Sequence, residues 1–376
     1  MKRPLPRDML SGKTPSRESP PDDARPAGAE PLDAEPLDVE PRDVSGKSVS
    51  FVERPPSGDA CSIIAPARWD RPIELRDDRP IDEAAGTCPF CRGREESTPP
   101  GLAEYGGSAR EGDWLVRVVP NKYPVAVAAK PPGTDVPSSA SVHGAHEVIV
   151  ESPHHVVEWT ELDVPQIERV IGAWCDRLTA AARSWRFASL FKNNGHRAGA
   201  SLSHVHSQLI AVDFVPPAVA TRESWLAQYY AEHHECWLCA RSSSSPTGSG
   251  RLIEAVNGET FALVVPAFSA MAGETWLVPV RHACHFHEMD GAVRSELARR
   301  LPATIATLRS IAGPFAYNLV VQTPSFGVSS EAPFHWYMRI IPRIVVLGGF
   351  EWSTECYINP LDPYRLAEDL RRRLGD

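Results

Sequence analysis

The chain has 376 residues, of which 42% are hydrophobic and 23% are charged, and its formal net charge is −9 at pH 7. This length is enough for two domains or one large domain, and the apolar content is enough for a sizeable core. The acidic balance argues against a general nucleic-acid-binding protein, while it leaves room for a basic pocket that takes a phosphorylated small molecule.

The first 48 residues are rich in Pro, Asp, Glu and Ala and contain the short tandem AEPLDAEPLDVEPRDV. Such a segment buries too little apolar surface to offset the entropy of ordering it, so we expect a disordered acidic tail over residues 1–48. The N-terminus lacks the apolar stretch of a secretory signal, and no run of about 20 apolar residues could span a membrane. We therefore expect a soluble, cytoplasmic protein without a membrane partner.

The remaining chain contains two copies of one plan, and we expect a catalytic half over residues 49–215 and a degenerate half over residues 216–376. In each copy a C-x-x-C pair comes first. A strand that ends in a proline and a histidine follows, then a long helix, then a strand that opens with a histidine. Strand-rich units with one long helix each are typical of the α+β class.

Apolar residues at helical spacing predict one long helix in each copy. The first covers residues 164–185, and its buried stripe is expected to be Ile167, Val170, Ile171, Trp174 and Leu178. The second lies within residues 290–312, and its stripe is expected to be Leu297, Leu301, Ile305 and Leu308. Pro302 is expected to weaken or bend the second helix. A further helix is predicted in the linker, in ESWLAQYYAEHH.

Eight cysteines in a chain of this kind are more typical of metal ligands or buried thiols than of disulfides. Two thiolates and two imidazoles form a closed, structural zinc site, so two ordered sets predict one zinc ion in each half. The first set is Cys88, Cys91, His155 and His204, and the second is Cys236, Cys239, His282 and His335. The alternative is that the cysteines are core thiols and the histidines satisfy backbone carbonyls. The remaining cysteines are expected to be buried or half-buried thiols: Cys61, Cys175, Cys284 and Cys356.

The segment GASLSHVHSQLIAVDF, residues 199–214, places His204, His206 and Gln208 at alternate positions of a predicted strand. Alternate side chains on a strand share a face. With His204 held by metal, His206 would be free to attack phosphorus as a neutral imidazole. Attack on a pyrophosphate expels a weakly basic phosphate monoester, and Gln208 can donate a hydrogen bond to a phosphoryl oxygen without supplying a proton. The second copy has Tyr337 in the place of His206, so we expect one chemical site per chain.

The stretch GASLSHVHSQ, with a C-x-x-C pair upstream, resembles the H-x-H-x-Q motif of the galactose-1-phosphate uridylyltransferase family, in the histidine-triad superfamily. The resemblance runs from about residue 60 to about residue 365, and APARWDRP, VVPNKYP and VIVESPHH are also similar to motifs of that family. It implies a duplicated histidine-triad-like α+β fold, a homodimer, and ping-pong nucleotidyl transfer through a covalent nucleotidyl-histidine.

The same resemblance implies a role for individual residues. His206 would be the nucleophile and Gln208 would stabilise the adduct. Substrate contacts are implied for Arg68 and Arg71, which would contact the phosphates or the partner subunit's ligand, for Asn121 at the nucleoside, and for Asn193, Gly199 and Ser201 at the phosphates. The resemblance implies that Cys88, Cys91, His155 and His204 form the family's zinc site. We assign no chemistry to the other histidines, His146 among them.

The reaction indicated most directly is UDP-glucose:hexose-1-phosphate uridylyl transfer, with galactose 1-phosphate as the acceptor. Two features depart from that branch: Val205 stands where it has proline, and RIVVLGGFEWSTECYINP lacks the lysine that grips the hexose phosphate. This tail and the second C-x-x-C pair resemble a plant branch that moves AMP between ADP-glucose and phosphate. The alternatives are therefore an ADP-glucose phosphorylase, a phosphorylase or hydrolase of dinucleoside polyphosphates, and a silent zinc-stabilised nucleotide-binding protein. The expected partners are a sugar nucleotide and a sugar phosphate or inorganic phosphate.

Overall fold

The computed structural model describes residues 51–53, 61–69, 86–107, 113–128, 142–243 and 251–374. The predicted tail over residues 1–48 and the side chain of Arg71 lie outside these ranges. Within them, no helix combines the length and the apolar character that a membrane span requires.

The main element is a ten-stranded sheet with the order β3-β4-β5-β7-β6-β11-β12-β10-β9-β8, and every pairing in it is antiparallel. The first half contributes β3 (Ala103–Tyr105), β4 (Val116–Pro120), β5 (Gly144–Val150), β6 (Phe187–Asn194) and β7 (His206–Val212). The second half contributes β8 (Leu252–Asn257), β9 (Phe261–Pro266), β10 (Thr275–Pro279), β11 (Tyr317–Gln322) and β12 (Tyr337–Pro342).

The strand order is the same in both halves when each is read outward from the centre. The β6–β11 pair lies at the centre, and the order β6-β7-β5-β4 on one side matches β11-β12-β10-β9 on the other. The registers also match, because Gln208 on β7 lies opposite Val148 on β5, and Arg339 on β12 lies opposite Trp276 on β10. The prediction of a duplicated α+β fold is confirmed.

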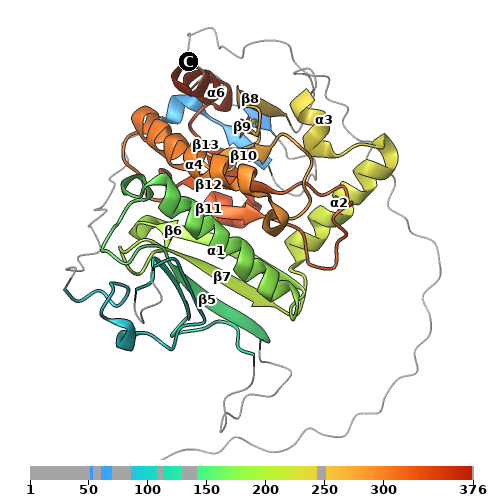
Figure 1. Cartoon of the computed structure of the whole chain (residues 1–376). Coiled ribbons are helices and arrows are strands. Elements are labelled where there is room, and N and C mark those ends of the chain that lie inside the picture. Colours follow the sequence, from blue (N-terminus) through green and yellow to red (C-terminus); the bar gives the residue numbers. More distant parts are fainter. Residues whose placement is uncertain are drawn as a thin grey trace, which may run out of the picture. The chain divides into compact units, whose positions relative to one another are not determined.

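Helices α1 (Val164–Ala182) and α4 (Gly291–Ala312) lie side by side across one face of the sheet, and α6 (Pro363–Leu374) packs beside α4 over β8 and β9 (Figure 1). Asp163 caps α1 by accepting a hydrogen bond from the backbone N–H of Gln166, and Asp290 caps α4 in the same way. Every residue of the two predicted stripes is buried. Pro302 lies inside the second helix, which runs without a break from Gly291 to Ala312.

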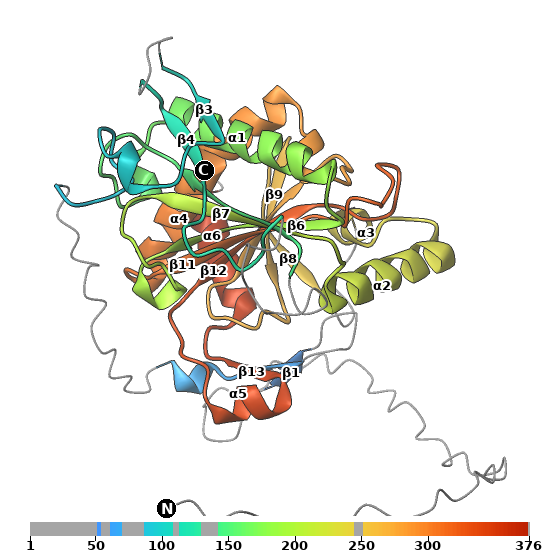
Figure 2. The same ribbon diagram turned by 90° about the horizontal axis from the view of Figure 1, so that it is seen from below.

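The opposite face of the second half carries a different set of elements (Figure 2). These are α2 (Pro217–His233), α3 (Trp237–Ser243), α5 (Gly349–Thr354), and a three-stranded sheet of β1 (Phe51–Glu53), β2 (Cys61–Ile64) and β13 (Cys356–Asn359). The predicted linker helix is α2, which begins earlier than expected. Short 3-10 helices complete the described elements: η1 (Pro66–Arg68), η2 (Glu95–Ser97), η4 (Trp159–Glu161), η5 (His196–Ala198) and η6 (Phe286–Glu288).

The expectation that Cys61 and Cys356 are thiols is wrong, because they form a disulfide between β2 and β13. The two residues lie opposite each other in the parallel pairing of these strands, although 295 positions separate them in the sequence. Cys175 and Cys284 are buried thiols, as expected.

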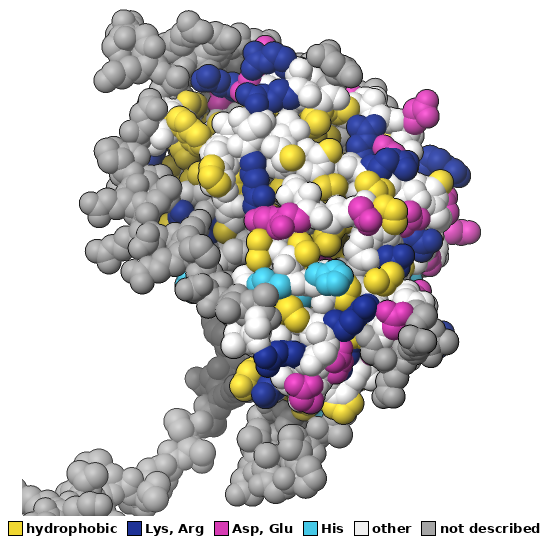
Figure 3. All heavy atoms as spheres, turned by 60° about the vertical axis from the view of Figure 1, so that its left-hand side comes forward, with side chains coloured by type: hydrophobic (Ala, Val, Ile, Leu, Met, Phe, Trp, Pro, Cys, Tyr) yellow, Lys and Arg dark blue, Asp and Glu magenta, His cyan; other side chains and the backbone are white. Residues whose placement is uncertain are grey.

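The face of the molecule shown in Figure 3 intersperses basic and acidic side chains. On the described part of that face there is no broad field of Lys and Arg, the feature expected of a general nucleic-acid-binding surface.

Candidate active site and metal centres

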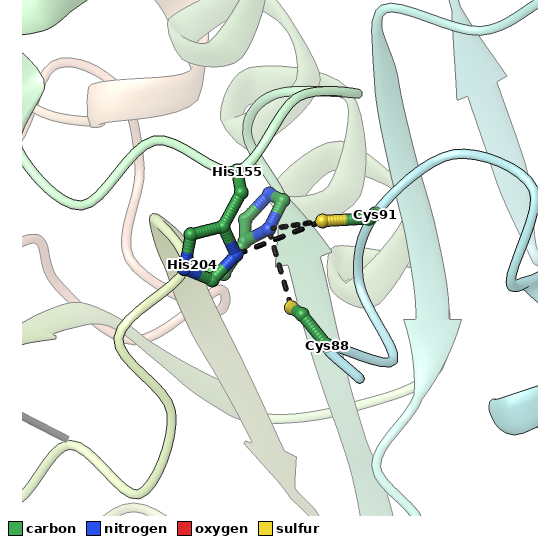
Figure 4. Close-up of side chains that lie close together, drawn as sticks. All are labelled: Cys88, Cys91, His155 and His204. Carbon is green, nitrogen blue, oxygen red and sulfur yellow. Dashed lines mark hydrogen bonds between the residues drawn. The ribbon is translucent and has the colours of Figure 1, made fainter. Parts of the chain in front are cut away.

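The first Cys/His cluster forms where three segments of the first half meet. Cys88 and Cys91 come from the loop before η2, His155 follows β5, and His204 precedes β7. The Nδ1 atom of His204 lies 3.4 Å from Cys88 Sγ and 3.6 Å from Cys91 Sγ, and His155 Nδ1 lies 3.6 Å from Cys91 Sγ. Figure 4 shows the sulfur atoms and imidazole rings pointing toward one another.

These separations fit a tetrahedral metal. Zinc bonds of about 2.3 Å to sulfur and about 2.05 Å to nitrogen, at tetrahedral angles, place S and N about 3.6 Å apart. The four donor atoms all lie within 4.8 Å of one another. His204 Nε2 donates to the backbone carbonyl of Ser152 at 2.9 Å, the outer contact that commonly orients a ligating imidazole. Burial lowers the pKa of His204 to about 4, so the ring is neutral and able to bind metal.

The second cluster repeats this arrangement in the other half. Cys239 Sγ lies 3.5 Å from His282 Nδ1 and 3.4 Å from His335 Nδ1, and Cys236 completes the set. The Cys239 thiol donates to Cys236 and holds the pKa of Cys236 well below its usual range. His282 Nε2 lies 3.2 Å from the carbonyl of Ala332. Both predicted ligand sets therefore come together in a geometry that could bind zinc.

His206 lies at the start of β7 and is 5% exposed. The prediction that His204 belongs to the same strand is wrong, because β7 begins at His206 and the backbone N–H of Val205 bonds to the carbonyl of Val156, outside the β5–β7 ladder. His206 points to the face away from the helices, since its neighbour Ser207 receives a hydrogen bond from Trp174 of α1.

The hydrogen bonding of His206 fixes its tautomer. Nδ1 lies 2.8 Å from the carbonyl oxygen of His204, and a carbonyl can only accept, so Nδ1 carries the proton. The other nitrogen, Nε2, therefore holds the lone pair. Burial, with a smaller contribution from the positive charge of Lys192, lowers the pKa of His206 and favours this neutral form.

Gln208 is oriented by a histidine that sequence reasoning missed. His146 on β5 accepts from the backbone N–H of Val125 through Nδ1 at 3.3 Å, so its Nε2 carries the proton and donates to Gln208 Oε1 at 2.9 Å. The NH2 group of Gln208 is thereby left to face the site as a donor. The Asn121 amide lies 3.1 Å from the same Nε2, which brings a predicted nucleoside contact to Gln208. His146 stands alone in the sequence, and only the β5–β7 register shows its position.

A buried ion pair, also missed, lies on the other side of the His206 backbone. Lys192 on β6 and Glu151 after β5 have side chains that are 1% and 0% exposed, and Lys192 Nζ lies 2.5 Å from Glu151 Oε2. Lys192 also donates to the carbonyl of His206 at 3.0 Å, and Trp159 Nε1 donates to Glu151 Oε2 at 2.5 Å. Burial lowers the pKa of Lys192, opposed by the neighbouring carboxylate.

The predicted phosphate contacts are partly assembled. Asn193 Oδ1 accepts from Asn318 Nδ2 at 2.8 Å across the central β6–β11 pair. Gly199 adopts φ = 87°, a left-handed conformation that favours glycine, and a Cβ there would lie 3.6 Å from Asn193 Nδ2. Ser201 is exposed in the turn that follows.

Arg68 does not join this group. It is exposed at the end of η1, directly after β2 of the three-stranded sheet. That sheet bonds to the second half through Ser62 and Asn359, which contact the backbone of Phe268 and Ser269.

Comparison with known proteins supports the arrangement found here. The sequence profile described as "Galactose-1-phosphate uridyl transferase, N-terminal domain" matches residues 62–216. ADP-glucose phosphorylase of Arabidopsis thaliana is 31% identical over 320 residues, which cover 82% of this chain and 89% of that protein. The chain belongs to the galactose-1-phosphate uridyl transferase family. It is therefore an enzyme of the nucleotidyltransferase kind.

Further matches in sequence and in structure are to proteins of the same kind. Galactose-1-phosphate uridylyltransferase of Thermotoga maritima is 23% identical over 308 residues, which cover 78% of this chain and 91% of that enzyme. The crystal structure of the Arabidopsis ADP-glucose phosphorylase with bound ADP-glucose has a TM-score of 0.74 and 29% identity, and covers 86% of this chain and 98% of that one. A structure of a uridylyltransferase, at 22% identity and a TM-score of 0.64 over 87% of this chain and 99% of that one, shares the fold.

Proposed function

We propose that this enzyme is an ADP-glucose phosphorylase that transfers AMP to inorganic phosphate through a covalent adduct on His206. One observation carries the mechanism. His206 is a neutral imidazole whose Nδ1–H is held by the carbonyl of His204, so the lone pair is on Nε2. An imidazole held in this way is suited to act as a nucleophile.

The reaction proceeds in two displacements. In the first, His206 Nε2 attacks the phosphorus atom of the adenylyl group, the bond to the bridging oxygen breaks, and glucose 1-phosphate leaves with the electron pair of that bond. The ring now carries a positive charge, and the carbonyl of His204 stabilises it by accepting from Nδ1–H. In the second, an oxygen of inorganic phosphate attacks the same phosphorus atom, which releases His206 and yields ADP.

Gln208 acts on the phosphoryl oxygens in both displacements. Its Oε1 is engaged by His146, so its NH2 group donates to the charge that develops on the phosphoryl group. Further substrate contacts are proposed for Asn121 at the nucleoside and for Asn193, Gly199 and Ser201 at the phosphates.

Two observations favour adenylyl over uridylyl transfer. The relative at 31% identity is an ADP-glucose phosphorylase, and its structure with bound ADP-glucose aligns with 86% of this chain. The segment 343–351 also lacks the lysine expected of the galactose-specific branch. The second candidate is uridylyl transfer to galactose 1-phosphate, which the match to the uridyl transferase profile and to the Thermotoga enzyme favours.

We propose one zinc ion in each Cys/His cluster, since the donor separations fit tetrahedral coordination. A closed set of two thiolates and two imidazoles supplies rigidity and leaves no open coordination position. In the first half this rigidity would also hold His206 in place, because His204 is both a proposed zinc ligand and the residue whose carbonyl orients His206.

The division into a catalytic half over residues 49–215 and a degenerate half over residues 216–376 is part of this proposal. So is a homodimer in which Arg68, exposed at the end of η1, contacts the phosphates or the ligand of the partner subunit.

The decisive experiment is intact-protein mass spectrometry after the enzyme is mixed with ADP-glucose or UDP-glucose in the absence of an acceptor. We expect an acid-labile adduct with the mass of AMP from ADP-glucose, which phosphate then removes. His206→Ala should give no adduct and retain its metal, whereas His233→Ala, an exposed histidine at the end of α2, should react as the wild type does. An adduct of UMP alone would support the second candidate, and an adduct that persists in His206→Ala would refute the covalent role of this residue.

A further inference from the structure

The duplication places residues of the second half at the positions of the catalytic residues. Gln208 faces Val148 in the first half, and Arg339 faces Trp276 in the second, so Arg339 occupies the position of Gln208. Two residues earlier on each strand, Tyr337 takes the position of the nucleophile. The second half therefore has the framework of a nucleotidyl-transfer site without the group that reacts.

The same register relates a second pair of residues. His146 lies two positions before Val148 on β5, and Glu274 lies two positions before Trp276 at β10. In the first half His146 bonds to Gln208, and in the second Glu274 Oε1 accepts from Arg339 at 2.7 and 2.8 Å. The second half thus keeps a polar pair at this position and replaces neutral groups with charged ones.

A pocket of about 430 Å³ lies on this face of the second half. Its floor is formed by β10 and β12, and its walls by α2, α3 and the loop before β10. The lining includes several aromatic side chains: Trp225, Trp237, Phe268, Trp276, Tyr337 and Tyr357. This volume is in the range of small-molecule sites, which are largely apolar with a few placed polar groups.

Four lining residues have buried polar atoms without a hydrogen-bond partner in the described part of the chain. These atoms are Glu274 Oε2, Arg222 Nε, Trp237 Nε1 and His335 Nε2. The Glu274 and Trp237 residues are only 2% and 5% exposed. Buried polar groups are nearly always paired, so one carboxylate oxygen and three nitrogen atoms without partners around a single pocket point to a ligand.

The chemistry of the lining selects the kind of ligand. Trp276 and Tyr337 are stacked with centroids 4.4 Å apart and an interplanar angle of 28°, which offers a flat aromatic surface to a planar ring. Glu274 Oε2 can accept from a ring amino group, and Arg222 can donate to an anionic group. Two arginines, Arg222 and Arg339, against one glutamate leave the pocket with an excess of positive charge.

We propose that this pocket is a second, non-catalytic site that binds a purine nucleoside monophosphate. The base lies against Trp276 and Tyr337 with an amino group on Glu274, and the phosphate lies near Arg222. The ligand is bound at this site without reacting, so the proposal does not depend on the reaction proposed for His206.

Photoaffinity labelling with 8-azido-AMP, followed by peptide mapping, tests the proposal because it reports where the base binds. We expect labels in the first half and also on peptides of the second half that line the pocket. The second-half label should be displaced by AMP and should persist in His206→Ala. Labels confined to the first half, a second-half label that excess AMP does not displace, or displacement by UMP as strong as by AMP would overturn the assignment.

Two variants test the individual contacts. Glu274→Gln should lower second-half labelling by about tenfold, the effect of losing one hydrogen bond to a charged group, while the exposed Glu331→Gln should leave it unchanged. Arg222→Met should weaken displacement by AMP and leave displacement by adenosine unaltered, since only the phosphate contact is lost. Metal content and thermal midpoint establish that each variant is folded. If both pocket variants fold and label as the wild type does, the pocket is not the site.

Discussion

Replacing Lys192 with Met tests how the first half holds His206, the proposed nucleophile. The substitution retains the apolar stem of the side chain but removes the charge that pairs with Glu151. Glu151 would stay buried with one hydrogen bond, from Trp159, for a full negative charge. Removing one partner of a buried ion pair costs about 3–5 kcal/mol. A loss of that size is a large fraction of the roughly 5–15 kcal/mol that stabilises a typical domain.

Denaturant unfolding of the metal-loaded protein, followed by tryptophan fluorescence, measures this loss. The exposed Lys122→Met is the matched control and should stay within about 0.5 kcal/mol of the wild type. Glu151→Leu alone should be as damaging as Lys192→Met, because it strands the other charge. The double variant should lose clearly less than the sum of the single losses, since neither charge is then buried alone.

The same substitution should slow adduct formation. Lys192 donates to the carbonyl of His206 at 3.0 Å, so its loss frees the backbone that carries the proposed nucleophile. Single-turnover adduct formation without denaturant should therefore be slower in Lys192→Met while the metal content is unchanged. A destabilisation below about 1 kcal/mol, or additive losses in the double variant, would refute the reasoning that this pair is tightly coupled.

Further predictions concern the metals, the disulfide and the adduct. Cys88→Ser should lose one metal equivalent and slow adduct formation, whereas Cys236→Ser should lose the other equivalent and still form the adduct. Metal analysis and intact-protein mass spectrometry check both variants. Equal loss of the adduct in the two variants would contradict the proposal that only the first half is catalytic. Cys61→Ser should lower the free energy of unfolding by about 2–5 kcal/mol in non-reducing denaturation, and no change would mean that the cross-link is dispensable. Gln208→His should shorten the lifetime of the adduct in water, because an imidazole can act as a general base toward water. Mass spectrometry over time gives this lifetime. An unchanged lifetime would contradict a general-base role for the introduced imidazole.

The sequence predicted those parts of the fold that leave a periodic or ordered pattern. Apolar spacing identified α1 and α4, because both bury one stripe against the sheet. The repeated order of C-x-x-C and histidine identified both Cys/His clusters. Pro302 did not interrupt α4, because Leu301 and Ile305 on either side of it are completely buried and tertiary packing outweighs the local preference.

Pairings that depend on register could not be predicted from the sequence. Cys61 and Cys356 meet only because β2 and β13 pair in parallel. His146 reaches Gln208 only through the β5–β7 register, and no local pattern distinguishes it from other histidines. Lys192 sits in a strand where a buried charge is unexpected, and its partner Glu151 is 41 residues away.

The second half distinguishes the role of the Cys/His clusters from that of the proposed nucleophile. His335 precedes β12 as His204 precedes β7, and both join a cluster of two cysteines and a second histidine. Two residues further on, the first half has His206 and the second has Tyr337. If the clusters served only the proposed reaction, the second half would have no physical use for one, since it has Tyr337 in place of His206 and lacks the imidazole that the reaction requires. What both halves share is a strand that must start at a fixed place beside a loop, and in both the cluster ties that start to the C-x-x-C segment. The clusters are therefore expected to serve the architecture of both halves, and in the first half the proposed reaction would use a strand start that the architecture has already fixed.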